Sequence, residues 1–169
     1  MKKASFFLVF TLVFSIFVLN AQTGNRHTES SGNFSICPPL NWTAEVIPGL
    51  TYRIFMGPQQ GNFRPNMNIV DEYYSGSLSE YVSLSTAGFT SIFPDALTIL
   101  NEPFSTGSGI NGKKILAFYS MAGVELCAAQ YAFNNENRMY VLTYVSMSSR
   151  IVDFINSFDE SARTFMFLR

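Results

Sequence analysis

The sequence predicts an α+β fold in which an antiparallel sheet of about six or seven strands lies between helical layers, an α/β/α sandwich. Apolar-rich runs between residues 97 and 147 are separated by short turn-forming segments, as in antiparallel hairpins. Residues 78–92 and 151–165 each repeat apolar side chains at helical spacing. The late strands are apolar on both faces, so both faces of the sheet need cover. The alternative arrangement places both helices on one face.

The first 21 residues have the pattern of a secretory signal peptide. Lys2 and Lys3 precede a mostly apolar run from Ser5 to Val18, and the small residue Ala21 suits a cleavage site. The run is shorter than the roughly 20 residues of a transmembrane helix. We therefore expect an exported protein, periplasmic or extracellular, with no stable membrane span after the signal is removed. The alternative is an uncleaved N-terminal anchor.

The remaining chain is long enough for one domain with a sizeable core. Residues 22–32 are polar and without periodicity, which predicts a flexible tail, and residues 33–169 are expected to form the single domain. Two of the 11 basic residues lie in the signal, against 12 acidic residues in the rest of the chain. The mature net charge is thus about −3 and no basic stripe exists, which argues against nucleic-acid binding.

Three short strands and a helix are expected in the first half of the domain. Alternation and turn residues indicate strands at 34–37, 52–56 and 67–74. The run from Ser77 to Glu80 fits a capping box, because the Ser77 side chain can accept from the third amide of the helix. Pro94 is expected to end this helix.

Four longer strands and a closing helix follow. The strands are expected at 97–105, 113–121, 125–134 and 138–147. The closing helix has an apolar stripe that opposes a charged face. Its members are Ile151, Phe154, Ile155, Phe158, Ala162 and Phe165.

Several short motifs resemble those of the PsbP-like family. They are the stretch FSICPPLNW at 34–42, NMNIV at 66–70, LSEYV at 78–82, GINGK at 109–113 and QYAF at 130–133, followed by the amphipathic helix at the end. The similarity runs over about residues 33–168. The resemblance implies an α/β/α sandwich, shared with extrinsic photosystem proteins and a Ran-binding regulator. It further implies a non-catalytic binding or assembly factor, and it offers no catalytic residues to carry over. The photosynthetic role itself does not transfer.

The residues themselves also argue against the common catalytic chemistries. His27 is the only histidine and lies in the expected tail, so imidazole-based mechanisms and His-rich zinc sites are disfavoured. The GSGING run at 107–112 matches a dinucleotide fingerprint by letter, but a strand follows it where that fingerprint requires a helix, so we interpret it as a hairpin loop. We therefore expect a non-enzyme without cofactor or metal.

Cysteines and adjacent acids have structural interpretations. Cys37 and Cys127 are the only cysteines, and either a disulfide or two buried thiols fits their surroundings. Neighbours on a strand point to opposite faces, so Asp71 and Glu72 are not expected to converge. The pair at 159–160 is expected on the solvent face of the last helix.

The stretch GPQQGNFRPNMNIV at 57–70, a loop that runs into a strand, is the best candidate for a binding site. It connects two strands, yet it is longer than a minimal hairpin and rich in hydrogen-bonding side chains, with Phe63 as an apolar tip. The candidate partner-binding residues are Gln59, Gln60, Asn62, Phe63, Arg64 and Asn66.

The function expected from these observations is an exported, non-catalytic binding or assembly module with an unknown protein partner. The alternative is a carrier of a small apolar ligand, motivated by the aromatic content, which would need a cavity of roughly several hundred Å³. A hydrolase is a further alternative and would need converging acids or an activated serine.

Overall fold

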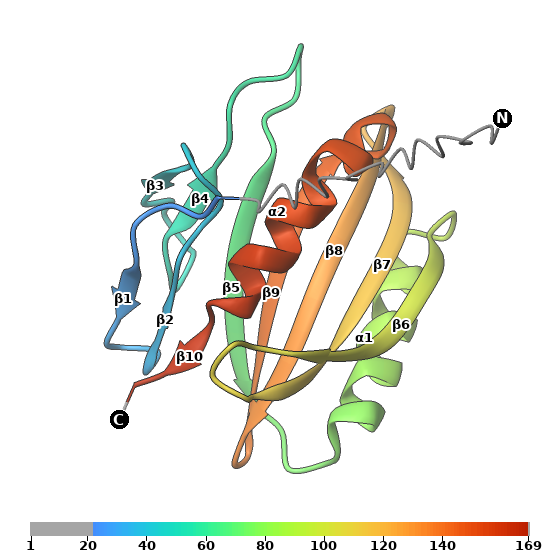
Figure 1. The fold of residues 1–169 in the computed structure, drawn as a ribbon. Coiled ribbons are helices and arrows are strands. Elements are labelled where there is room, and N and C mark those ends of the chain that lie inside the picture. The colour runs from blue at the N-terminus through green and yellow to red at the C-terminus, as the bar shows by residue number, and fades with distance from the viewer. Residues whose placement is uncertain (1–21, 169) are drawn as a thin grey trace, which may run out of the picture.

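The computed structural model describes residues 22–168, which form a seven-stranded antiparallel sheet, a small three-stranded sheet and two α-helices (Figure 1). The strand order is β3-β4-β5-β9-β8-β7-β6 in the large sheet and β1-β2-β10 in the small one. The elements are β1 His27–Glu29, β2 Phe34–Ile36, β3 Thr43–Glu45, β4 Ile54–Met56, β5 Asn66–Tyr73, α1 Leu78–Ile92, β6 Leu97–Ser105, β7 Asn111–Met121, β8 Val124–Asn135, β9 Arg138–Met147, the 3₁₀ turn η1 Ser148–Arg150, α2 Ile151–Arg163 and β10 Met166–Phe167.

Tight turns fix the register of the central strands. Met121 pairs with Val124 across the two-residue turn Ala122-Gly123, whose φ angles are 51° and 76°. Two successive positive φ angles are the mark of a type I′ turn, which matches the twist of a hairpin. The glycine-rich run at 107–112 likewise leads into strand β7, as the sequence predicts.

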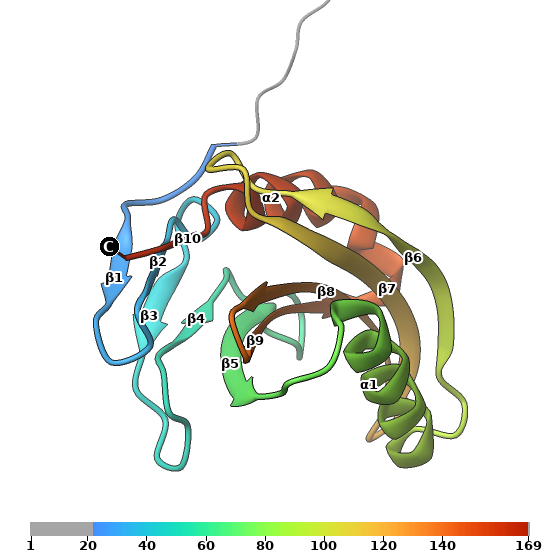
Figure 2. The same ribbon diagram turned by 90° about the horizontal axis from the view of Figure 1, so that it is seen from below.

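The two helices cover opposite faces of the sheet, which confirms the sandwich over the arrangement with both helices on one side (Figure 2). Helix α2 packs on β8 and β9, and α1 packs on β7 and β8. Each face has its own apolar cluster. The α2 side buries Tyr131, Tyr144, Phe158 and Phe165 completely, whereas the α1 side buries Tyr81, Val82, Ile115 and Met139.

Helix α1 begins and ends where its sequence predicts. The Ser77 hydroxyl accepts a hydrogen bond from the Glu80 amide at 3.2 Å, which satisfies one free donor of the first turn. The helix ends at Ile92, with Phe93 at the C-cap and Pro94 immediately after it.

An ion pair and hydrogen bonds also join α2 to the sheet, in addition to the aromatic contacts. The Lys114 ammonium lies 2.7 Å from Asp159, and the Tyr131 hydroxyl donates to the same carboxylate at 2.5 Å. Two residues further along the helix, the Tyr144 hydroxyl donates to the Ser161 hydroxyl at 2.9 Å. Asp159 is therefore a partly buried anchor, which corrects the prediction that it lies on the solvent face. Its position is explained by Lys114, a cation that the sheet presents beneath the helix.

The prediction of a flexible tail at 22–32 does not fit the structure. Residues 27–29 form β1, which pairs with β2 in antiparallel register. Arg26 adds a hydrogen bond to Ser35 at 2.9 Å and one to the Thr164 carbonyl at 3.1 Å. Strand β2 needs partners for its own backbone, and this polar segment supplies one of them. The expected signal peptide, residues 1–21, lies outside the described residues.

Other differences concern short elements. Strands β3 and β10 were not predicted from the sequence. They have only three and two residues, too few to show an alternating pattern. The closing helix ends at Arg163, so Phe165 belongs to the segment after it, although it is fully buried as the apolar stripe predicts.

We predict that Phe158→Ala lowers the free energy of unfolding by about 3–5 kcal/mol, because the fully buried ring stacks on Tyr144 and Phe154 and its removal leaves a cavity. Urea unfolding followed by circular dichroism measures the loss. Val152→Ala, on the same helix but 76% exposed, is the control and should change the value by less than about 0.5 kcal/mol. Equal effects of the two substitutions would contradict this packing.

Candidate functional site

The loop between β4 and β5 extends beyond one end of the large sheet and closes in a tight turn (Figure 1). The Gln60 amide donates to the Phe63 carbonyl at 2.8 Å, and the Phe63 amide donates back to Gln60 at 3.0 Å. Gly61 occupies the turn with a φ of 56°, a conformation that favours glycine. The Gln59 side chain donates to the Gly61 carbonyl at 2.9 Å. The tip is thus a defined turn held by its own hydrogen bonds.

Arg64 holds the base of this loop. Its guanidinium donates to the Gly57 carbonyl at 2.8 Å, to the Glu45 carboxylate at 2.7 Å and to the Thr43 hydroxyl at 3.0 Å. These bonds tie the loop to strand β3, on the far side of β4. Arg64 is therefore already occupied within the protein, and its role is to position the loop.

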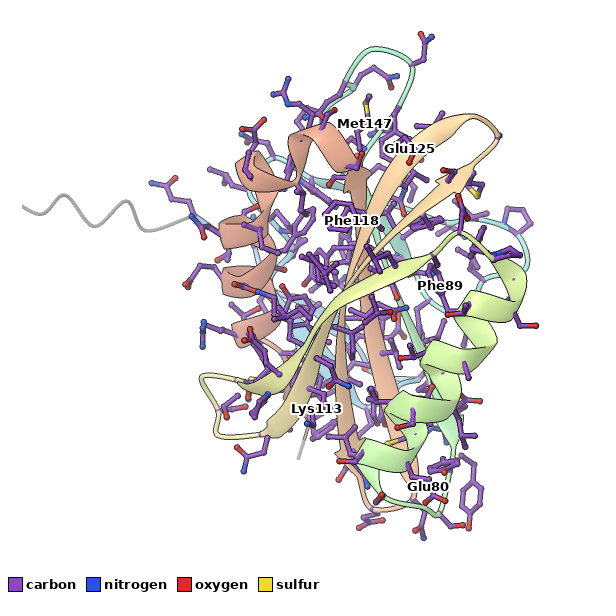
Figure 3. The ribbon with its side chains drawn as sticks, turned by 90° about the vertical axis from the view of Figure 1, so that its right-hand side faces the viewer. Glu80, Phe89, Lys113, Phe118, Glu125 and Met147 are labelled. Atoms are coloured by element: carbon purple, nitrogen blue, oxygen red, sulfur yellow. The ribbon has the colours of Figure 1, made fainter. Side chains whose placement is uncertain are left out.

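A groove of about 940 Å³ lies between the loop tip and the end of the central strands. It is lined by three segments, Pro58–Phe63, Gly123–Glu125 and Met147–Arg150. Figure 3 shows Glu125 and Met147 at this end of the sheet and Glu80 at the opposite end. One wall of the groove is thus the β4–β5 loop. The other wall is formed by the β7–β8 turn and by the segment that leads into α2.

The groove combines an apolar side with many polar groups. Phe63 and Val124 pack against the cluster of Tyr119, Leu126 and Ala128, so Phe63 is half-buried instead of being the exposed tip that the sequence predicts. The physical reason is that the sheet end offers apolar surface directly beside the turn. Phe63 therefore forms part of a wall.

The polar groups of the groove provide hydrogen-bond donors and acceptors. The Gln60 side-chain oxygen is buried and, among the described residues, has no hydrogen-bond partner. No side chain caps the amides at the start of η1 or α2, and Arg150 pairs with Asp153 at 2.5 Å. Glu125 accepts from Ser120 at 2.5 Å. Such a surface suits a ligand that carries both amide-like donors and acceptors.

The structure divides the candidate residues predicted from the sequence. Four of them line the groove, namely Gln59, Gln60, Asn62 and Phe63. Arg64 and Asn66 do not. Asn66 lies in β5 opposite Val145, and its side chain donates to the Arg64 carbonyl at 3.4 Å.

Sequence reasoning missed the second wall of the groove. Val124, Glu125 and Met147–Arg150 are distant in sequence from the loop and reach it only through the strand order. The sequence signals available were the turn at 122–124 and the start of the helical pattern at 151, both of which mark sheet ends.

The adjacent acids Asp71 and Glu72 each form structural contacts. Asp71 accepts from Tyr52 at 2.7 Å and pairs with Arg138, whereas Glu72 on the opposite face accepts from Tyr81 at 2.5 Å. The two acids therefore diverge, as predicted. Burial and the bond to Glu72 raise the pKa of Tyr81 to about 12.

His27 is engaged in contacts within the protein. The His27 ring lies 3.8 Å from Glu29 and packs edge-on against Phe55. Within residues 22–168, no group of three or more His, Cys, Asp or Glu side chains is placed to hold a metal ion.

Both cysteines are free thiols that lie at opposite ends of α2. The backbone of Cys37 bonds to the side chains of Ser161 and Thr164 near the end of the helix, whereas Cys127 pairs with Ser146 just before its start. The helix of 13 residues spans about 20 Å, so a disulfide with Cα atoms within about 7 Å does not fit this fold. Burial raises the pKa of the Cys127 thiol to about 12.

Comparison with known proteins shows a shared fold without a shared sequence. No protein-family model and no curated protein matches the chain. Among solved structures, cyanobacterial PsbP from Synechocystis matches with 12% identity, a TM-score of 0.65 and coverage of 92% of this chain and 98% of that chain. The Ran-binding protein Mog1p of Saccharomyces cerevisiae matches with 7% identity, a TM-score of 0.62 and coverage of 87% and 97%.

A third similar structure is LpqN of Mycobacterium tuberculosis, described as involved in cell envelope biogenesis, with 10% identity, a TM-score of 0.60 and coverage of 86% of both chains. The chain therefore has the PsbP-like fold that its motifs predict.

None of the helices in residues 22–168 has the length and apolar character to cross a membrane.

We predict that native protein at pH 8 keeps Cys127 unreactive towards Ellman's reagent, because a fully buried thiol with a raised pKa stays protonated and inaccessible. Unfolding in guanidinium chloride without reductant should expose two titratable thiols. Absence of free thiols in the unfolded, unreduced protein would reveal a disulfide and contradict the structure.

Arg64→Ala should loosen the β4–β5 loop, because the Gly57 carbonyl and Glu45 lose their donor. We expect faster hydrogen–deuterium exchange at the Gly57 and Gln60 amides, corresponding to about 1–2 kcal/mol of local stability. Asn62→Ala, at the exposed tip, serves as the control and should leave exchange at Gly57 unchanged. Unchanged exchange in Arg64→Ala would show that the loop is held by other means.

Proposed function

We propose that this chain is an exported, non-catalytic binding or assembly module that holds a segment of a protein partner in the groove beside the β4–β5 loop. The observation that carries the proposal is the groove itself, in which a loop rich in amide side chains faces the entry of α2 across about 940 Å³. A volume of this order accommodates several residues of an extended peptide.

Rigid surroundings favour binding at this place. Arg64 fixes the base of the loop, and the second wall belongs to the start of β8, the end of β9 and the 3₁₀ turn η1 that leads into α2. Recognition loops carried on a rigid scaffold lose less conformational entropy on binding. The exposed Asn62 side chain, which lines the groove, offers an amide donor and acceptor to a peptide backbone.

The comparisons support a binding role through analogy of fold. Mog1p is a Ran-binding protein, and LpqN is described as involved in cell envelope biogenesis. The signal-peptide pattern of residues 1–21 supports export to the envelope or beyond. The pocket beneath α1, at about 150 Å³, is smaller than a carrier of apolar cargo needs, so the peptide-binding proposal is preferred.

Photo-crosslinking tests the proposal directly. Benzoylphenylalanine in place of Asn62, an exposed residue that lines the groove, should yield a discrete crosslinked partner when the protein is illuminated with an envelope extract. The matched control is the same replacement at exposed Asn137, in the β8–β9 turn at the other end of the 12-residue strand β8, about 40 Å away.

The crosslinking pattern distinguishes binding in the groove from binding elsewhere. A band formed at Asn62 and suppressed by the additional substitution Gln60→Ala supports the groove, since Gln60 lines the same wall. The same bands at both positions, or none at Asn62, would contradict a binding site at this end of the sheet.

A further inference from the structure

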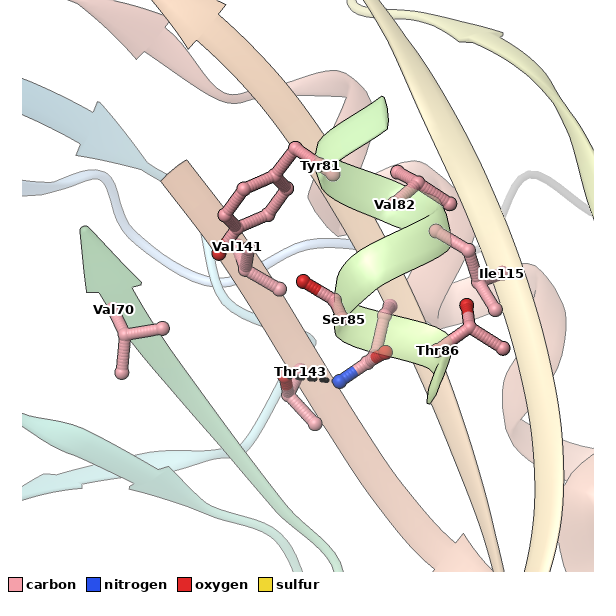
Figure 4. Close-up of a pocket in the computed structure, with 10 residues that line it drawn as sticks. Val70, Tyr81, Val82, Ser85, Thr86, Ile115, Val141 and Thr143 are labelled. Carbon is pink, nitrogen blue, oxygen red and sulfur yellow. Dashed lines mark hydrogen bonds between the residues drawn. The ribbon is translucent and has the colours of Figure 1, made fainter. Parts of the chain in front are cut away.

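A second pocket, of about 150 Å³, lies between α1 and the sheet face that α1 covers (Figure 4). It is lined by residues of α1 and of strands β5, β7, β8 and β9, and is separate from the groove in its lining residues. The lining residues are Val70, Tyr81, Val82, Ser85, Thr86, Ile115, Gln130, Ala132, Val141 and Thr143.

The sequence of α1 explains why this space is open. At each end of the helix large side chains reach the sheet, Tyr81 near the start and Phe89 near the end. The turn between them presents Ser85 and Thr86, and the strand below presents the small residue Ala132. Short side chains on both sides leave a gap that neighbouring elements cannot close, because the helix is held at both ends.

The pocket has an apolar part and a polar part. Val82, Ile115 and Val141 supply the apolar surface. The polar side chains are Ser85, Thr86, Gln130 and Thr143, and Figure 4 shows Ser85 and Thr143 directed into the space between helix and sheet.

Two of these polar side chains, Gln130 and Thr143, are only loosely bonded to each other. The Gln130 amide donates to the Thr143 hydroxyl at 3.4 Å, the long end of the hydrogen-bond range. By contrast, the Tyr81 hydroxyl is committed to Glu72 at 2.5 Å. Gln130 and Thr143 can therefore reorient towards a guest, whereas Tyr81 acts as a fixed wall.

We propose that this pocket binds a small neutral molecule made of one ring or branched alkyl group and one hydroxyl or amide. A cavity of 150 Å³ in a protein core is large enough to bind benzene, so the volume fits a guest of about six to eight heavy atoms. The guest's apolar part contacts Val82, Ile115 and Val141, and its polar group bonds to Gln130 or Thr143.

The absence of charge among the lining residues sets the ligand class. None of the ten lining side chains is acidic or basic, so an ionised guest would lose hydration without gaining a counter-charge. Val70 at the β5 side is 47% exposed, which gives a guest a path from solvent without moving α1.

Phenol, toluene and benzoate are suitable probes because they share a ring and differ in the polar group. Methyl-labelled protein is titrated with each probe and followed by NMR. Phenol should shift the Val82, Ile115 and Val141 methyl signals in a saturable way, more tightly than toluene, and benzoate should leave them unchanged. Thr143→Val should reduce the preference for phenol over toluene, because one partner of the hydroxyl is lost.

Matched variants on α1 separate binding from general effects. Ser85→Leu places a larger side chain in the pocket and should weaken phenol binding about tenfold or more. Ser83→Leu makes the same change on the exposed face of the helix, where the Ser83 hydroxyl bonds only to the Ser79 carbonyl, and should leave binding within about twofold. Dispersed spectra confirm that both variants fold.

Three results would overturn the proposal. They are phenol binding that is unaffected by Ser85→Leu, benzoate binding equal to that of phenol, and no saturable methyl shift at millimolar phenol. The last result would mean that the space holds only water.

Discussion

The fold depends on one requirement, that a sheet with two apolar faces must be covered on both. Helix α2 meets it on one side, where Phe158 stacks on Tyr144 and the ion pair between Lys114 and Asp159 holds the helix in register. Burial of the aromatic rings supplies the driving force, and the polar bonds select one position along the sheet. Because α2 is fixed, the segment Met147–Arg150 at its start is fixed too, and it becomes a wall of the groove.

On the other face the same requirement is met less completely. Helix α1 packs closely through Tyr81 and Phe89 but leaves a small space at its middle turn, and Val70 on the neighbouring strand stays half exposed. The two faces thus differ in kind. The α2 side is a solid aromatic core that supports the groove at the sheet end, whereas the α1 side retains room for a guest.

Much of this architecture could be predicted from local sequence signals. The predictions that failed concern features for which no local signal exists. The Ser77 cap, the two-residue turn at 122–123 and the apolar stripe of the last helix are local, so they specify α1, the β7–β8 hairpin and α2. Strand β1 is a short polar segment without an alternating pattern, and the burial of Phe63 depends on Tyr119, Leu126 and Ala128, which lie far along the chain. For the same reason, four of the six candidate residues line the groove, while its second wall emerged only from the strand order.

The central claim is that docking of α2 on the sheet fixes the groove before any partner arrives. Spin labels at residues 62 and 149, on a background without Cys37 and Cys127, measure this most directly by electron–electron double resonance. A preformed groove should give one narrow distance distribution in the free protein, which broadens when Phe158→Ala weakens the helix contact. A broad or multimodal distribution in the otherwise intact protein would contradict a preformed groove.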